Sequence, residues 1–171
     1  MRKSLILIVL PIILSSCSFS MSKSQDERFA SITDGPSFAA YMIPRDIGEI
    51  VGSSAIRQIT NDLPVNETFS RIQSQRIKEA KQIQDLYRSW TGRIYPVNIT
   101  SPTPFVNLDG LSAGDAIKQY AETAIAYNEE TIAAAKHAKK TASGAALSDL
   151  VEQVVSSREK ELEELRPLAK E

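Results

Sequence analysis

Residues 112–168 read SAGDAIKQYAETAIAYNEETIAAAKHAKKTASGAALSDLVEQVVSSREKELEELRPL, and this stretch decides the fold. Ser112 and Asp115 are spaced as a capping box that starts a helix, and apolar or small residues then recur at helical spacing. The run Ala142-Ser143-Gly144 breaks the pattern, which resumes after it. The stretch therefore predicts two long amphipathic helices joined by a short turn.

An earlier copy of this stretch lies 82 positions towards the N-terminus, on residues 38–86. In each copy, the apolar stripe of the second helix contains an arginine followed three positions later by a glutamate. One hairpin has an apolar face that it cannot bury alone, so two copies are expected to pack together. The chain is therefore predicted to be a duplicated hairpin, which pairs Val154, Arg158, Glu161 and Leu165 with Ile72, Arg76, Glu79 and Ile83.

The earlier copy should also form two helices. Asp34 can cap the first of them, which we expect to run to about residue 62. Pro44 lies inside this pattern, so either the helix kinks there or its regular part begins there. The second helix is expected at about residues 66–90, with Asn66 as its cap.

The segment between the two copies, residues 93–110, contains three prolines, and this composition excludes a helix. Extended at about 3.3 Å per residue, the segment reaches roughly 60 Å, whereas a helix of about 25 residues is only about 38 Å long. It can therefore cross the whole bundle, which places the second and third helices parallel. Two short turns and one long crossover predict an all-α fold, a ferritin-like four-helix bundle over residues 36–171.

The N-terminus has the features of an export signal. Arg2 and Lys3 precede an apolar run at residues 5–14, which is too short for a stable membrane span. The run ends in Leu14-Ser15-Ser16-Cys17, which resembles the lipobox of bacterial lipoproteins, whose cysteine is acylated. Several acyl chains on one residue anchor a protein stably. We therefore expect lipidation of Cys17; the alternative is an ordinary secretory signal with an incidental cysteine.

Removal of the signal peptide, residues 1–16, would leave a domain attached to a membrane through its lipid anchor. Residues 17–35 are rich in Ser, Lys, Gln and Asp, and we expect them to form a flexible tether. Ser18 follows the cysteine, where an aspartate would resemble an inner-membrane retention signal. In a host with two membranes, the sequence therefore favours the outer membrane, with the domain facing the periplasm.

The charge and residue types exclude several classes of function. Loss of Arg2 and Lys3 with the signal peptide leaves 18 basic and 21 acidic residues, without the basic cluster that nucleic-acid binding needs. Ala134 stands three positions before the single histidine, His137, so the Glu-x-x-His motif of a di-iron bundle is missing. One histidine and one lipidated cysteine supply no nucleophile–base set. The sequence therefore predicts no enzyme activity, no cofactor, no metal ligands and no nucleic-acid partner.

Two motifs of the first copy resemble a known family. Phe38-Ala39-Ala40-Tyr41-Met42-Ile43-Pro44-Arg45-Asp46, followed by Ile72, Arg76, Glu79 and Trp90, resembles exported ferritin-like proteins catalogued as domain of unknown function 305. Members of that family read Met-Ile-Pro-His-His and then Ile-x-x-x-Gln-x-x-Glu-Ile, and some are periplasmic copper-binding proteins built from two such units. The resemblance covers about residues 36–168 and implies a ferritin-like bundle.

The chain departs from that family at the histidine pair. Arg45-Asp46 stands in its place in the first copy, and Tyr127-Asn128 in the second. Another exported ferritin-like family of unknown function is similar to the chain at Leu111 to Ala113. The resemblance therefore implies the fold, and periplasmic copper binding enters as an alternative function.

Six polar residues repeat at matching depths on or beside the apolar stripes. Buried charges are costly unless they are paired, so we expect these side chains to meet across the bundle. One interpretation is a degenerate ligand pocket whose arginines accept an anion. The other, which we favour, is an internal salt-bridge layer that fixes the helix register. The six residues are Asp46, Arg76, Glu79, Asn128, Arg158 and Glu161.

These observations together favour a non-enzymatic bacterial envelope lipoprotein whose bundle has a structural or interaction role. The alternative is a periplasmic copper-binding protein. A third hypothesis, an oxidase or peroxidase of the ferritin type, would require bound iron.

Overall fold

The computed structural model describes residues 25–97 and 105–170, and every regular element within them is a helix. This confirms the predicted all-α four-helix bundle. A short helix, α1 (Gln25–Arg28), precedes the four long helices, which are α2 (Gly35–Ile59), α3 (Leu63–Thr91), α4 (Ala113–Thr141) and α5 (Ala145–Leu168).

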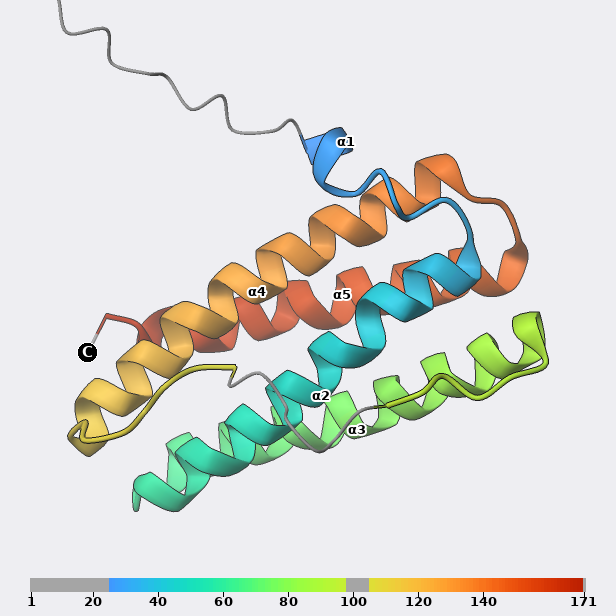
Figure 1. The fold of residues 1–171 in the computed structure, drawn as a ribbon. Coiled ribbons are helices and arrows are strands. Elements are labelled where there is room, and N and C mark those ends of the chain that lie inside the picture. The colour runs from blue at the N-terminus through green and yellow to red at the C-terminus, as the bar shows by residue number, and fades with distance from the viewer. Residues whose placement is uncertain (1–24, 98–104, 171) are drawn as a thin grey trace, which may run out of the picture.

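The four long helices form two hairpins that pack against each other (Figure 1). α2 runs antiparallel to α3, and α4 to α5, and these two pairs share the most extensive contacts. α2 also packs on α4, and α3 more sparsely on α5. α3 ends at one end of the bundle and α4 begins at the other, so these two helices are parallel, as predicted. Part of the crossover that joins them, residues 98–104, lies outside the described residues.

Two predicted helix starts are confirmed. Asp34 caps α2, because its carboxylate accepts a hydrogen bond from the Ser37 backbone N–H at 2.8 Å. Ser112 caps α4 in the same way, accepting from the Asp115 N–H at 3.2 Å. α2 is helical on both sides of Pro44, so its regular part does not begin at the proline.

The predicted start of the next helix is wrong by about one turn. α3 begins at Leu63 and not at Asn66, because Asp62 is the capping residue and accepts from the Val65 N–H at 3.1 Å. Pro64 therefore lies in the first turn of α3, where its missing N–H costs no helical hydrogen bond.

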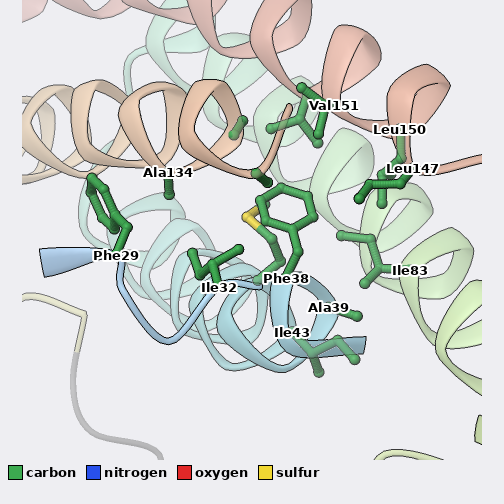
Figure 2. Close-up of a cluster of buried hydrophobic side chains, with 14 residues drawn as sticks. Phe29, Ile32, Phe38, Ala39, Ile43, Ile83, Ala134, Leu147, Leu150 and Val151 are labelled. Carbon is green, nitrogen blue, oxygen red and sulfur yellow. The ribbon is translucent and has the colours of Figure 1, made fainter. Parts of the chain in front are cut away.

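Two apolar clusters fill the bundle, one towards each end. The cluster around Phe38 lies where the N-terminal segment joins the bundle (Figure 2), and the other is built around Phe69 and Tyr120. Phe38 and Tyr120 are 82 positions apart, yet they belong to opposite clusters. The shift that relates the two copies therefore exchanges the two ends of the bundle, as an approximate twofold axis across it would.

The packed part of the chain begins before residue 36. Phe29 and Ile32 are only 2% and 1% exposed and belong to the first apolar cluster (Figure 2). The Thr141 hydroxyl donates to the Ile32 carbonyl at 3.1 Å and holds this segment in place. The predicted tether, residues 17–35, is thus packed on the bundle from Phe29 onward, because two apolar side chains in a polar stretch gain free energy by leaving water.

None of the helices in the described ranges combines the length and the apolar character of a membrane span. The predicted signal peptide, residues 1–16, and the predicted lipidation site, Cys17, lie outside those ranges. Both stay predictions.

Candidate functional site

A layer of polar side chains crosses the middle of the bundle, between the two apolar clusters. Each long helix contributes two residues, and all eight are at most 6% exposed. The six residues predicted from the sequence are all among them. We call this set the central layer; it consists of Asp46 and Glu49 from α2, Arg76 and Glu79 from α3, Asn128 and Thr131 from α4, and Arg158 and Glu161 from α5.

The sequence prediction missed Glu49 and Thr131. Glu49 follows Asp46 by three positions and Thr131 follows Asn128 by three, so each new residue shares a helix face with a predicted one. The two are also 82 positions apart, like the pairs that were predicted. The repeat therefore contained a signal for both, one turn further along each helix.

Arg76 binds carboxylates from three different helices. Its Nη1 donates to Glu79 Oε2 at 3.1 Å. Its Nε and Nη2 make short charge-assisted hydrogen bonds to Glu49 Oε2 and Glu161 Oε2, respectively. The guanidinium of Arg76 thus connects α2, α3 and α5.

Arg158 makes a comparable set of bonds from the opposite hairpin. Its Nη1 donates to Glu49 Oε2 at 2.6 Å. Its Nη2 donates to Asp46 Oδ1 at 2.6 Å and to Glu79 Oε1 at 2.7 Å. The nearest oxygen of Glu161, one turn along α5, is 3.7 Å from Nη1. Glu49 is therefore bound by both arginines.

The ion pairs follow the internal repeat. Adding 82 to Arg76 gives Arg158, and subtracting 82 from Glu161 gives Glu79, so the pair Arg76–Glu161 corresponds to the pair Arg158–Glu79. Both pairs are formed, and each joins one hairpin to the other. The central layer therefore has the approximate twofold symmetry that the duplication predicts.

Three polar atoms of the central layer are buried without a hydrogen-bond partner in the described structure: Asp46 Oδ2, Asn128 Oδ1 and Arg158 Nε. The amide nitrogen of Asn128 does have a partner, since it donates to Glu161 Oε2 at 3.3 Å. Two of the three orphaned atoms are oxygens. The layer therefore holds more hydrogen-bond acceptors than it has donors to satisfy, if all its carboxyl groups are ionised.

Burial shifts the acid–base equilibria of this layer. Loss of solvent raises the pKa of Asp46 and of Glu79 well above the usual carboxyl range. It also raises the pKa of Glu161 to about 7 and raises that of Glu49, although attraction to Arg76 opposes the shift in both. Burial alone would lower the pKa of Arg76, but the surrounding carboxylates outweigh it and raise the value, so this guanidinium stays charged.

The arrangement favours the internal salt-bridge layer over an anion pocket. An incoming anion would have to displace carboxylates of the chain itself from both arginines, and each of those bonds is charge-assisted and buried. Four carboxyl groups around two guanidinium groups already exceed the positive charge of the site. The layer therefore resists anions.

The described residues also offer a poor fit to a soft metal ion. No group of three or more His, Cys, Asp or Glu side chains within residues 25–97 and 105–170 has the arrangement of a metal site. Met42 is fully buried in the first apolar cluster. His137 lies on α4 beside Phe29, with ring centroids 6.1 Å apart, six residues after Thr131 and outside the central layer.

A groove between α3 and α5 leads from the surface to the central layer. It has a volume of about 630 Å³, and Glu161 is among the residues that line it. Two polar pairs join α3 to α5 along this seam: Arg71–Glu164 at 2.8 Å and Gln82–Gln153 at 2.8 Å. These pairs also correspond under the shift of 82, since Arg71 maps to Gln153 and Glu164 to Gln82.

Comparison with known proteins identifies no family for this chain. No family model matches it, and no curated protein matches it either. The resemblance to the family catalogued as domain of unknown function 305 therefore stays a prediction.

The fold does have counterparts among solved structures. CopM in the Ag-bound form superimposes with a TM-score of 0.67 and 15% sequence identity, covering 80% of this chain and 96% of CopM. The Cu(II)-bound form gives 0.66 and 14%, covering 80% and 97%, and the apo form gives 0.67 and 14%, covering 80% and 96%. At this level of identity the similarity shows a shared fold alone.

Proposed function

We propose that the chain is a non-enzymatic bacterial envelope lipoprotein whose four-helix bundle has a structural or interaction role. The observation that carries this proposal is the central layer, in which both arginines bind carboxylates of the chain itself. A bundle whose interior is closed by its own ion pairs offers its outer surface to other molecules. Lipidation of Cys17 would hold that surface close to the membrane.

Membrane attachment is tested by the substitution Cys17→Ser. Attachment in this proposal depends on the acyl chains, so the variant should move to the soluble fraction while the parent chain sediments with membranes. A wash at high salt distinguishes acyl anchoring from charge attraction, since only the latter is screened. If the variant still sediments after the wash, the proposed anchor is wrong.

The comparisons favour a second candidate function, a periplasmic protein related to copper. Its support is the shared fold with CopM, which was solved with Ag and with Cu(II) bound. The family resemblance in the sequence points the same way. The described side chains contain no group of three or more His, Cys, Asp or Glu that could hold a metal ion, so a metal-binding measurement decides between the two candidates.

Dialysis of the purified protein against Cu²⁺ and against Zn²⁺, followed by measurement of bound metal, separates them. The first candidate predicts no stoichiometric retention. The second predicts retention of copper that is lost in His137→Ala and kept in Lys140→Ala, a control on the exposed end of the same helix. If copper is retained stoichiometrically and shows that pattern, the metal-binding candidate is supported and the structural role is rejected.

A further inference from the structure

The central layer contains more acid than base. The two guanidinium groups of Arg76 and Arg158 face four carboxyl groups, so full ionisation would leave a net charge of about −2 in the bundle interior. The next cation along α2, Arg45, attracts Glu49 and bonds to Thr131, but it is paired with Glu130 at 3.0 Å, so the two together add no net charge. The side chains that α4 contributes to the interior here are uncharged: Tyr120, Asn128 and Thr131.

Two of the carboxyl groups are held against each other. Asp46 Oδ1 and Glu79 Oε1 lie 2.6 and 2.7 Å from the same nitrogen of Arg158, so the two carboxyl groups are close neighbours. Neighbouring carboxylates repel, and one proton between them removes the repulsion. The other oxygen of Asp46, Oδ2, is buried without a hydrogen-bond partner among the described residues, so no donor stabilises a negative charge on it. A carboxyl group in this environment favours its protonated form. Burial raises the pKa of both groups, in agreement with the geometry.

The same layer contains a further carboxyl group, Glu161, at the edge that faces the α3–α5 groove. Glu161 accepts bonds from Arg76 and Asn128 within the layer and also lines the α3–α5 groove. Burial raises the pKa of its carboxyl group to about 7, so Glu161 also titrates near neutral pH.

We propose that the Asp46–Glu79 carboxyl pair binds a shared proton in the folded protein and releases it when the protein unfolds. The geometry of the two carboxyl groups on one nitrogen of Arg158 carries this proposal. This inference goes beyond the proposed function and does not depend on it.

The sign of the pH dependence follows from proton binding. The folded protein holds protons that the unfolded chain, with ordinary carboxyl pKa values near 4, releases. The stabilisation is therefore complete below about pH 4. It is lost as the pH rises through the raised pKa values of Asp46, Glu79 and Glu161, of which the pKa of Glu161 is about 7. Each proton released on unfolding makes the unfolding equilibrium constant rise about tenfold per pH unit.

Urea unfolding of the purified protein at a series of pH values tests the proposal. The series runs from about pH 5.5 to about pH 8.5, roughly one and a half units on either side of neutral. We expect the unfolding constant to rise by at least about tenfold per pH unit around pH 7. The variant Asp46→Asn replaces the protonated carboxyl by a neutral group that also donates, so it should lower this rise by about tenfold per pH unit. Asp85→Asn, an exposed carboxyl on α3, is the matched control and should behave like the parent.

A second variant and a second measurement keep the test decisive. If Asp46→Asn does not fold, Glu79→Gln removes the other half of the pair and should flatten the pH dependence in the same way. Calorimetric unfolding in two buffers of different ionisation heat counts the protons directly, and we expect about one to two released per molecule near neutral pH. The proposal is overturned if no protons are released, or if Asp46→Asn and Asp85→Asn respond alike. It is also overturned if added Na⁺ at constant ionic strength removes the pH dependence, because a bound cation would then balance the charge.

Discussion

The two hairpins each supply one arginine to the central layer, but they supply different numbers of acidic residues. α3 and α5 each contribute an arginine and a glutamate at corresponding positions. α2 contributes Asp46 and Glu49, whereas α4 contributes Asn128 and Thr131 at the positions 82 residues later. Two identical hairpins would bring six carboxyl groups to two guanidinium groups. The neutral residues of α4 therefore limit the negative charge that the bundle must bury.

The difference also explains which bonds are symmetric. The pairs Arg76–Glu161 and Arg158–Glu79 use only residues that both copies retain, and both pairs are formed. Glu49 breaks the symmetry, because its Oε2 is bound by both arginines and its counterpart, Thr131, has no charge to offer. The first hairpin thus provides the carboxylate that both arginines share, and the second hairpin has no equivalent of it.

Loss of either arginine should have the largest effect. Arg76→Ala or Arg158→Ala leaves at least two buried carboxylates without their cation, and we expect each to lower the free energy of unfolding by about 3–5 kcal/mol. Similar losses at both positions would support the symmetry of the two hairpins. Urea unfolding at pH 7 measures them. A loss of 0–1 kcal/mol, typical of solvent-exposed ion pairs, would mean that the arginines are not buried.

Adding an acid to the second hairpin is a sharper test of the comparison. Asn128→Asp makes α4 resemble α2 and introduces a fifth carboxyl group, so we expect a loss of about 1–3 kcal/mol at neutral pH. The loss should shrink at pH 5, because burial raises the pKa of a carboxyl group at this position and favours its neutral form. A variant as stable as the parent at both pH values would show that the layer tolerates further negative charge, so the neutral residues of α4 would not be needed to limit it.

Removing a cation and an acid together should cost less than removing the cation alone. Arg76→Leu combined with Glu79→Met replaces two charges by apolar side chains of similar size but still leaves Glu161 without Arg76. We therefore expect a loss of about 1–3 kcal/mol, smaller than that of Arg76→Ala. Thermal and urea unfolding of the double variant, compared with Arg76→Ala, measure the difference. If the double variant is the less stable of the two, the cost lies in lost contacts rather than in an uncompensated charge.

The pairs at the α3–α5 seam should have the smallest effect. Arg71 is about half exposed in its pair with Glu164, and a surface ion pair contributes about 0–1 kcal/mol. We expect Arg71→Ala to lower the free energy of unfolding by no more than that. Gln153→Ala, at the corresponding position of the second copy, should behave in the same way. A loss above about 2 kcal/mol at either position would show that the seam depends on its surface pairs as well as on the central layer.

Helical periodicity and the internal repeat were enough to predict the fold. Charged residues on an apolar stripe must find partners, so the repeat of Arg76 and Glu79 at Arg158 and Glu161 indicated a buried layer before any geometry was known. The crossover and the parallel course of α3 and α4 followed from the length and the prolines of residues 93–110.

The details that the sequence did not reveal depend on tertiary contacts. Asp62 and Asn66 are both good capping residues, and only the position of the chain between α2 and α3 selects Asp62. Phe29 and Ile32 lie in a polar stretch without periodicity, and their burial depends on an apolar surface that α2 and α4 build together. The position of Glu49, one turn after Asp46, could have been found from the repeat, but the convergence of both arginines on its carboxylate depends on tertiary packing.

A double-mutant cycle on Arg158 and Glu79 tests most directly whether the two hairpins are joined by one buried ion network. The free energies of unfolding of Arg158→Ala, Glu79→Ala, the double variant and the parent give the coupling energy between the two side chains. The network predicts a coupling of about 1.5–3 kcal/mol, because the two groups share a buried bond of 2.7 Å and the same neighbours. A coupling within about 0.5 kcal/mol of zero, as for independent sites, would contradict the account.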